Sequence, residues 1–285
     1  MRYEAPETLE RAVALLAGES EARVLAGGTD LLVQMKTDVI EPGLIVDIKR
    51  IAELRRIDAE SGGFRVGAAV TGAEMKEHAR LKAAWPGLVE AANLIGSTQV
   101  QGRATMGGNL CNGSPAADSV PALIAAGAVA IVAGPKGRRE LAVEDVMLAP
   151  RKLALAKGEI IVGFFLPAKP KRSGDAYLRF IPRTEMDIAV VGCGVALTLD
   201  AGGTCTAARV SLGAVAARPL LVADAAKALI GTKVDAGALA KAAAASSAAC
   251  QPIDDKRGTK EFRIKIAGVL TRRTAEIALA RAKQN

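Results

Sequence analysis

T-M-G-G-N-L-C-N-G-S-P-A-A-D-S, residues 105 to 119, is the most informative stretch of this sequence. Gly107 and Gly108 have no Cβ, so the backbone there can adopt positive φ angles and let a bulky anion approach its N–H groups. The helix that follows begins either at Ser114, with Pro115 in its first position, or at Asp118 as the N-cap. We expect a loop that binds a phosphate, although a lone Gly-Gly pair is more often an ordinary turn.

A second glycine pair makes the phosphate interpretation stronger. Ala26-Gly27-Gly28-Thr29-Asp30 follows a short apolar strand and precedes an apolar helix expected at residues 31–36. Two phosphates held between two such loops would describe a dinucleotide. Other nucleotide motifs fail: Gly192-Cys193-Gly194 has Leu197 where a dinucleotide fingerprint needs a third glycine, and no Gly-Lys dipeptide exists for a P-loop.

The order of helix and strand patterns predicts an α+β protein of three parts. Residues 1–56 read as a small β-α-β unit, and residues 57–170 as a sheet-centred unit with two hairpins and two helices before the 105–119 loop. A polar, basic linker with two prolines, residues 167–174, precedes the last part. Residues 171–285 read as three antiparallel strands followed by three helices.

Composition excludes several classes of function. The net charge of +8 suits an acidic ligand or partner, but aromatic residues are only 3% and no basic run is interleaved with them, so we expect no nucleic-acid binding. His78 is the only histidine, and the four cysteines form no C-x-x-C pair, so no metal site is expected. No secretion signal or membrane span is evident, which favours the cytoplasm.

The two glycine loops, taken with later motifs, resemble a known family. The segments Ala26 to Leu31, Thr105 to Asn112 and Ser114 to Ser119 are similar to the FAD-binding medium subunit of the molybdenum hydroxylases, which include xanthine dehydrogenase and carbon monoxide dehydrogenase. The similarity extends to Tyr177-Leu178-Arg179, to Arg183 with Asp187-Ile188-Ala189, and to Asp255 to Arg263, where the charged residues could equally be structural or interface ion pairs. Met106 and Gly102 depart mildly from the family pattern.

The resemblance implies a two-part FAD-binding domain of the vanillyl-alcohol oxidase and carbon monoxide dehydrogenase flavoprotein type, plus a C-terminal α+β domain. FAD would be bound non-covalently. It would be the only cofactor on this chain, because some family members hold a [4Fe–4S] cluster in a cysteine-rich inserted segment, whereas Cys111 is the only cysteine between residues 57 and 167 here. The cofactor-binding residues implied are Ala26, Gly27, Gly28, Thr29, Asp30, Leu31, Leu32, Thr105, Met106, Gly107, Gly108, Asn109, Ser114, Asp118, Ile161 and Arg179. Of these, Ser114 and Asp118 would bond the ribityl and phosphate region, and Ile161 and Arg179 would lie near the ring or the adenine.

The function implied is that of an electron-transfer subunit without catalytic residues of its own. It would take electrons from [2Fe-2S] clusters on a small partner subunit and pass them to NAD, a quinone or oxygen. A large partner subunit would carry the molybdenum cofactor and the substrate site. The resemblance implies that the three subunits assemble as a dimer of heterotrimers. The alternative is a free-standing FAD-dependent reductase with its own substrate site; a scaffold that has lost its nucleotide is disfavoured by the intact glycines.

Overall fold

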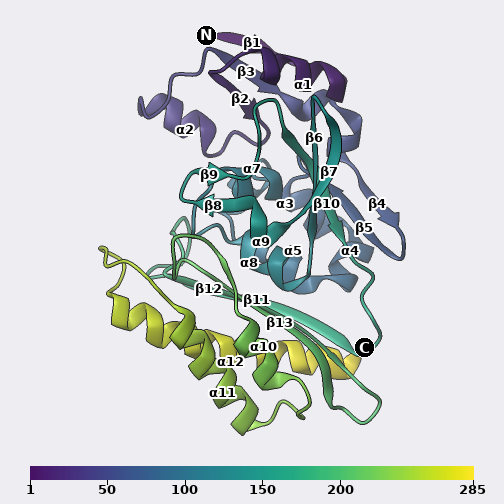
Figure 1. Cartoon of the computed structure of the whole chain (residues 1–285), viewed down its shortest axis with the longest axis vertical. Helices are drawn as coiled ribbons and strands as arrows, with labels where there is room; N and C mark the ends of the chain where they lie inside the picture. The colour runs from purple at the N-terminus through teal and green to yellow at the C-terminus, as the bar shows by residue number, and fades with distance from the viewer.

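The computed structural model describes residues 1–285 and contains three principal sheets (Figure 1). The first sheet is parallel, in the order β1-β3-β2, and confirms a β-α-β unit at the N-terminus. Every residue of β3 is buried, as expected for the central strand of a parallel sheet. Its elements are β1 (Arg2–Glu4), α1 (Leu9–Gly18), β2 (Ala22–Leu25), α2 (Leu31–Lys36) and β3 (Leu44–Asp47), followed by the 3-10 turns Ile48–Arg50 and Ala52–Arg55.

The second sheet is antiparallel, in the order β4-β5-β10-β6-β7. Its strands are β4 (Ile57–Glu60), β5 (Gly63–Gly67), β6 (Val129–Gly134), β7 (Gly137–Ala142) and β10 (Ile160–Leu166). Short helices connect β5 to β6: α3 (Gly72–Glu77), α4 (Ala79–Ala84), α5 (Pro86–Ala92), α6 (Thr98–Gln101), α7 (Met106–Cys111) and α8 (Ser119–Ala125). Between β7 and β10 lie α9 (Val143–Val146) and the small pair β8 (Met147–Ala149) and β9 (Lys152–Leu153).

The third sheet is antiparallel, in the order β11-β12-β13-β14, and carries three helices on one face (Figure 1). Its other face packs on α5 and α8 of the preceding unit. The sequence predicted three strands here; the fourth, β14, is only two residues long and follows no alternating pattern. The elements are β11 (Ser173–Phe180), β12 (Val191–Leu199), β13 (Cys205–Gly213), β14 (Leu220–Leu221), α10 (Ala223–Leu229), α11 (Ala236–Ala249) and α12 (Lys260–Gln284).

The stretch from 105 to 119 is more ordered than the loop predicted from its sequence. Residues 106–111 form α7, and Thr105 caps this helix by accepting a hydrogen bond from the Gly108 N–H. Of the two starts considered for the next helix, the one at Asp118 is correct, since α8 begins at Ser119. The Asp118 side chain makes no cap hydrogen bond, however, because it faces the third sheet instead.

Apolar cores join neighbouring sheets. One core lies between the second sheet, its helices and Tyr177 of the third sheet, and another lies between the third sheet and α10 to α12. A third core combines α1 and β3 with Ile131, Ile160 and Val162 of the second sheet. The first unit therefore shares its core with the second, which fixes the relative position of the loops that leave both sheets.

The contact between α5 and β11 leaves no room for a side chain at Gly87. A Cβ there would lie 2.6 Å from the Cα of Ala176, so Gly87→Ala must push the second and third units apart. We expect this variant to lose about 1–3 kcal/mol of unfolding free energy, measured by urea denaturation. Gly18→Ala is the matched control, since nothing lies within 4 Å of its added Cβ; equal stability of the two variants would contradict this packing.

Candidate cofactor site between two glycine loops

One cavity of about 490 Å³ lies where the loop after β2 meets the turn before α7. The two segments are in direct contact, because a Cβ on Gly27 would overlap the carbonyl oxygen of Arg103 and lie 3.2 Å from the Cα of Ala104. Only glycine permits this approach. The sequence placed both loops near one ligand, and the tertiary structure brings them together at one cavity.

Both segments carry backbone N–H groups that have no partner within the protein. None of the N–H groups from Gly27 to Leu31 donates a hydrogen bond, and neither do those of Thr105 and Gly107. All of these residues line the cavity. Buried or half-buried N–H groups are almost always satisfied, so two unpaired runs at one cavity indicate a missing acceptor. An anion with several oxygens fits this set of donors.

Each glycine of the two pairs has a different role. Gly28 has a φ of +78°, a conformation that turns the chain from β2 into α2. Gly107 packs against the second sheet, where a Cβ would lie 2.5 Å from the carbonyl oxygen of Ala68. Gly108 is less restricted, since its Cβ would meet only the Thr105 hydroxyl at 3.1 Å. In the second pair, therefore, Gly107 is needed for close packing, and Gly108 leaves the backbone accessible from the cavity.

Most of the residues implied by the sequence line this cavity. They are Ala26, Gly27, Gly28, Thr29, Asp30, Leu31, Thr105, Gly107, Gly108, Asn109 and Ile161. Asn109 is held in place, since its Oδ1 accepts hydrogen bonds from both the N–H and the hydroxyl of Ser119. These residues meet at one cavity because α1 and β3 share an apolar core with the second sheet.

Five residues of the sequence-based set do not line the cavity: Leu32, Met106, Ser114, Asp118 and Arg179. Leu32 lies on α2 with 48% of its surface exposed, whereas Met106 is buried in the core of the second unit. Ser114 accepts a hydrogen bond from the Ala116 N–H within its own turn. These positions support the cavity wall or lie beside it.

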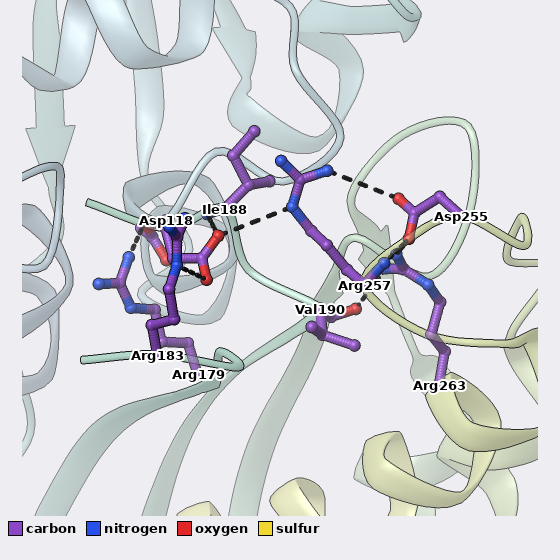
Figure 2. Close-up of polar contacts among 9 residues, drawn as sticks. Asp118, Arg179, Arg183, Ile188, Val190, Asp255, Arg257 and Arg263 are labelled. Carbon is purple, nitrogen blue, oxygen red and sulfur yellow. Dashed lines mark hydrogen bonds and ion pairs between the residues drawn. The ribbon is translucent and has the colours of Figure 1, made fainter. Parts of the chain in front are cut away.

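Asp118 is buried and joins the second unit to the third (Figure 2). Its Oδ1 accepts a hydrogen bond from Tyr177 Oη at 2.8 Å, and its Oδ2 accepts one from Arg179 Nη1 at 2.7 Å. Burial raises the pKa of Asp118 to about 6, although the Arg179 charge and these hydrogen bonds lower it. Burial and the Asp118 carboxylate also raise the pKa of Tyr177. Both oxygens of Asp118 are thus engaged inside the protein.

A second charged cluster includes Arg183, Asp255 and Arg257, which Figure 2 labels. Arg183 Nε is 3.1 Å from an oxygen of Asp187, and Arg257 bridges from Asp187 to Asp255. The buried Arg263 donates to the Val190 carbonyl and to Asp255. Of the two roles left open for these charges by the sequence, the structural one is observed here: they tie the segment before β12 to the start of α12.

Several residues that the sequence did not predict also line the cavity. Arg23 and Val24 come from β2, and Ile95 follows α5. Arg151 and Lys157 come from the segment between β8 and β10 and supply positive charge. No local pattern marks these positions, since they reach the cavity only through the packing of the second sheet against the first. The positive φ of Arg151, 62°, is visible only in the structure.

Comparison with known proteins decides the family. Residues 1–169 match the model described as the FAD binding domain in molybdopterin dehydrogenase, and residues 176–278 match the CO dehydrogenase flavoprotein C-terminal domain. The chain belongs to the FAD-binding medium subunits of the molybdenum hydroxylases. Membership of this family makes it an oxidoreductase subunit with an FAD-binding domain, as the sequence resemblance predicted.

Individual members of the family align over almost their full length. The carbon monoxide dehydrogenase medium chain of Afipia carboxidovorans is 37% identical over 282 residues, covering 99% of this chain and 97% of that protein. The xanthine dehydrogenase FAD-binding subunit of Escherichia coli O157:H7 is 32% identical, with 98% and 96% covered. A chain of the cyanide-inactivated Cu,Mo-CO dehydrogenase superposes with a TM-score of 0.95 at 36% identity, covering 99% of this chain and 98% of that chain.

A second solved structure, less similar in sequence, has a similar fold. Quinoline 2-oxidoreductase from Pseudomonas putida 86 superposes with a TM-score of 0.91 at 28% identity, covering 99% of this chain and 98% of that chain. None of the helices in the present structure combines the length and apolar character needed to cross a membrane.

The raised pKa of Asp118 predicts a specific dependence of stability on pH. Because its folded pKa of about 6 exceeds the unfolded value, the native state binds more protons between those values, and its contribution to stability falls as pH rises through that window. The unfolding free energy of the natural protein minus that of Asp118→Asn should therefore fall by on the order of 2 kcal/mol from pH 4 to pH 6.5. Urea denaturation at each pH measures it; a constant or rising difference would mean that Arg179 keeps the carboxylate ionised throughout.

Proposed function

We propose that the 490 Å³ cavity is the FAD site and that its two runs of unpaired N–H groups bind the pyrophosphate. This single observation carries the proposal, since a pyrophosphate supplies the several acceptor oxygens that both runs need at once. The N–H groups from Gly27 to Leu31 would face one phosphate, and those of Thr105 and Gly107 would face the other. Arg151 and Lys157 add positive charge to the same cavity.

The remaining wall suits the flat ring of a flavin. Ile95, Leu153, Leu155 and Ile161 provide apolar surface, and Asn109 provides an oriented amide. A mostly apolar cavity with a few placed polar groups, in the size range of cofactor sites, is the usual arrangement. Asp118 and Arg179 would then have an indirect role. They form an ion pair with each other and together hold the third unit against α8.

Bound FAD would supply one- and two-electron redox chemistry, so we propose that the chain is the electron-transfer subunit of a molybdenum hydroxylase. Its own residues bind the cofactor, orient it and set its electrostatic surroundings; none is proposed as an acid or base. The partners would be a small [2Fe-2S] subunit and a large molybdenum-cofactor subunit, arranged as a dimer of heterotrimers in the cytoplasm. Electrons would leave to NAD, a quinone or oxygen.

The domain boundaries near residues 56 and 170 remain part of this proposal. The matched family segments, 1–169 and 176–278, support a division at the linker between β10 and β11. The shared core of α1, β3 and the second sheet supports treating residues 1–56 and 57–170 as two halves of one FAD-binding domain.

Gly27→Ala tests the cofactor site. The added Cβ would overlap Arg103 and separate the two glycine loops, so we expect FAD affinity to fall at least about tenfold while the third unit stays folded. Flavin content of the purified protein and fluorescence titration of FAD into the apo protein measure it. Gly102→Ala is the matched control, because its nearest new neighbour is at 3.5 Å. Full FAD occupancy in Gly27→Ala would remove the support for this site.

Helix α2 offers a test of the subunit assignment. It buries none of its residues, and Val33 is 58% exposed and does not line the cavity. Val33→Asp should leave FAD binding intact and prevent co-purification of the [2Fe-2S] and molybdenum subunits, because an apolar contact would be replaced by unpaired charge. A natural protein that purifies alone and reduces a substrate with NADPH would instead support the free-standing reductase.

A further inference from the structure

The first glycine loop is a thin wall between two cavities. The proposed FAD site lies on one side of this loop, and a second cavity of about 270 Å³, lined in part by Lys49 and Arg103, lies on the other. Ala26, Gly27 and Thr105 line both cavities. Each peptide group of this wall can therefore direct its carbonyl to one cavity and its N–H to the other.

Basic side chains bind the carbonyls of this wall from the second cavity. Lys49 Nζ donates to the Ala26 carbonyl oxygen at 3.1 Å, and Arg103 Nε donates to the Gly27 carbonyl oxygen at 3.4 Å. All peptide bonds are trans, so the N–H of each peptide points away from its own carbonyl. The N–H groups of Gly27 and Gly28 are therefore directed away from these two cations, and neither has a partner within the protein.

Lys49 is itself held by a network from the first sheet. Its Nζ is 2.7 Å from Asp47 Oδ1, and that oxygen also accepts the Lys49 N–H. Tyr3 Oη donates to Asp47 Oδ2 at 2.6 Å. Burial alone would raise the pKa of Asp47, but the hydrogen bonds from Lys49 and Tyr3 and the Lys49 charge hold it below its ordinary value. A charged carboxylate at the end of β3 thus fixes the ammonium group under the loop.

We propose that Lys49 is a positioning residue that sets the orientation of the Ala26-Gly27 peptide and so presents the Gly27 N–H to the anion. The proposal rests on the FAD site proposed above. Glycine permits the peptide to rotate, and the rotated peptide would place a carbonyl oxygen against the pyrophosphate, where it repels the anion. The ammonium–carbonyl hydrogen bond stabilises the productive orientation before any ligand binds, so the anion site is preorganised.

The test compares Lys49→Met, Lys49→Arg and Asp47→Asn with the natural protein in its apo form. ADP reports on the phosphate site and riboflavin on the ring site. Lys49→Met should bind FAD and ADP at least tenfold more weakly and riboflavin with unchanged affinity, and Lys49→Arg should restore most of the loss. Arg50→Met is the matched control, since Arg50 is an exposed cation on the same turn without a hydrogen bond to the loop.

Asp47→Asn separates positioning from simple charge attraction. It removes a negative charge, so attraction alone predicts tighter ADP binding, whereas loss of the Lys49 anchor predicts weaker binding. Amide NMR of the apo protein gives a second readout: Lys49→Met should shift the Gly27 resonance, and Arg50→Met should not. Unchanged ADP affinity in Lys49→Met, equal loss of riboflavin binding, or tighter binding by Asp47→Asn would each overturn the inference. If ADP does not perturb Gly27 or Gly28 in the natural protein, the proposed site itself is wrong.

Discussion

The contact between Gly27 and the backbone of Arg103 and Ala104 is the constraint on which the site depends. It brings together the loop after β2 and the turn between α6 and α7, at a distance that no residue with a Cβ could reach. Both segments thereby present unsatisfied N–H groups to one cavity. The shared core of α1, β3 and the second sheet makes this contact rigid, because neither sheet can move without disrupting packed apolar side chains.

The third unit supports the site without lining the cavity. Its sheet packs on α5 and α8, and the buried group of Asp118, Tyr177 and Arg179 fixes α8 against β11. Breaking a buried ion pair by removing one partner leaves an uncompensated charge, which is strongly destabilising. The geometry behind the second glycine loop therefore depends on residues far along the chain.

Sequence reasoning was most successful where function requires a residue type that has no substitute. No side chain can replace the glycines at 27, 28 and 107, because a close approach or a positive φ excludes a Cβ there, and the linked motifs identified the family. It was less successful with Asp118 and Arg179, whose charges suggested ligand contacts but which bond each other. It also missed Arg151 and Lys157, because a solvent-exposed cation and a cavity cation look alike in a sequence.

The sequence by itself determined the α+β class of the protein and the two glycine loops, which follow from local composition and from motifs contiguous along the chain. The identity of the cofactor came from the resemblance of these motifs to a known family. Only the tertiary structure decided which N–H groups remain unpaired, which side of the Ala26-Gly27 peptide faces Lys49, and which charges are consumed in internal pairs. These features arise from contacts between residues such as Ala26 and Lys49 or Asp118 and Arg179, and pairing across such separations is set by packing.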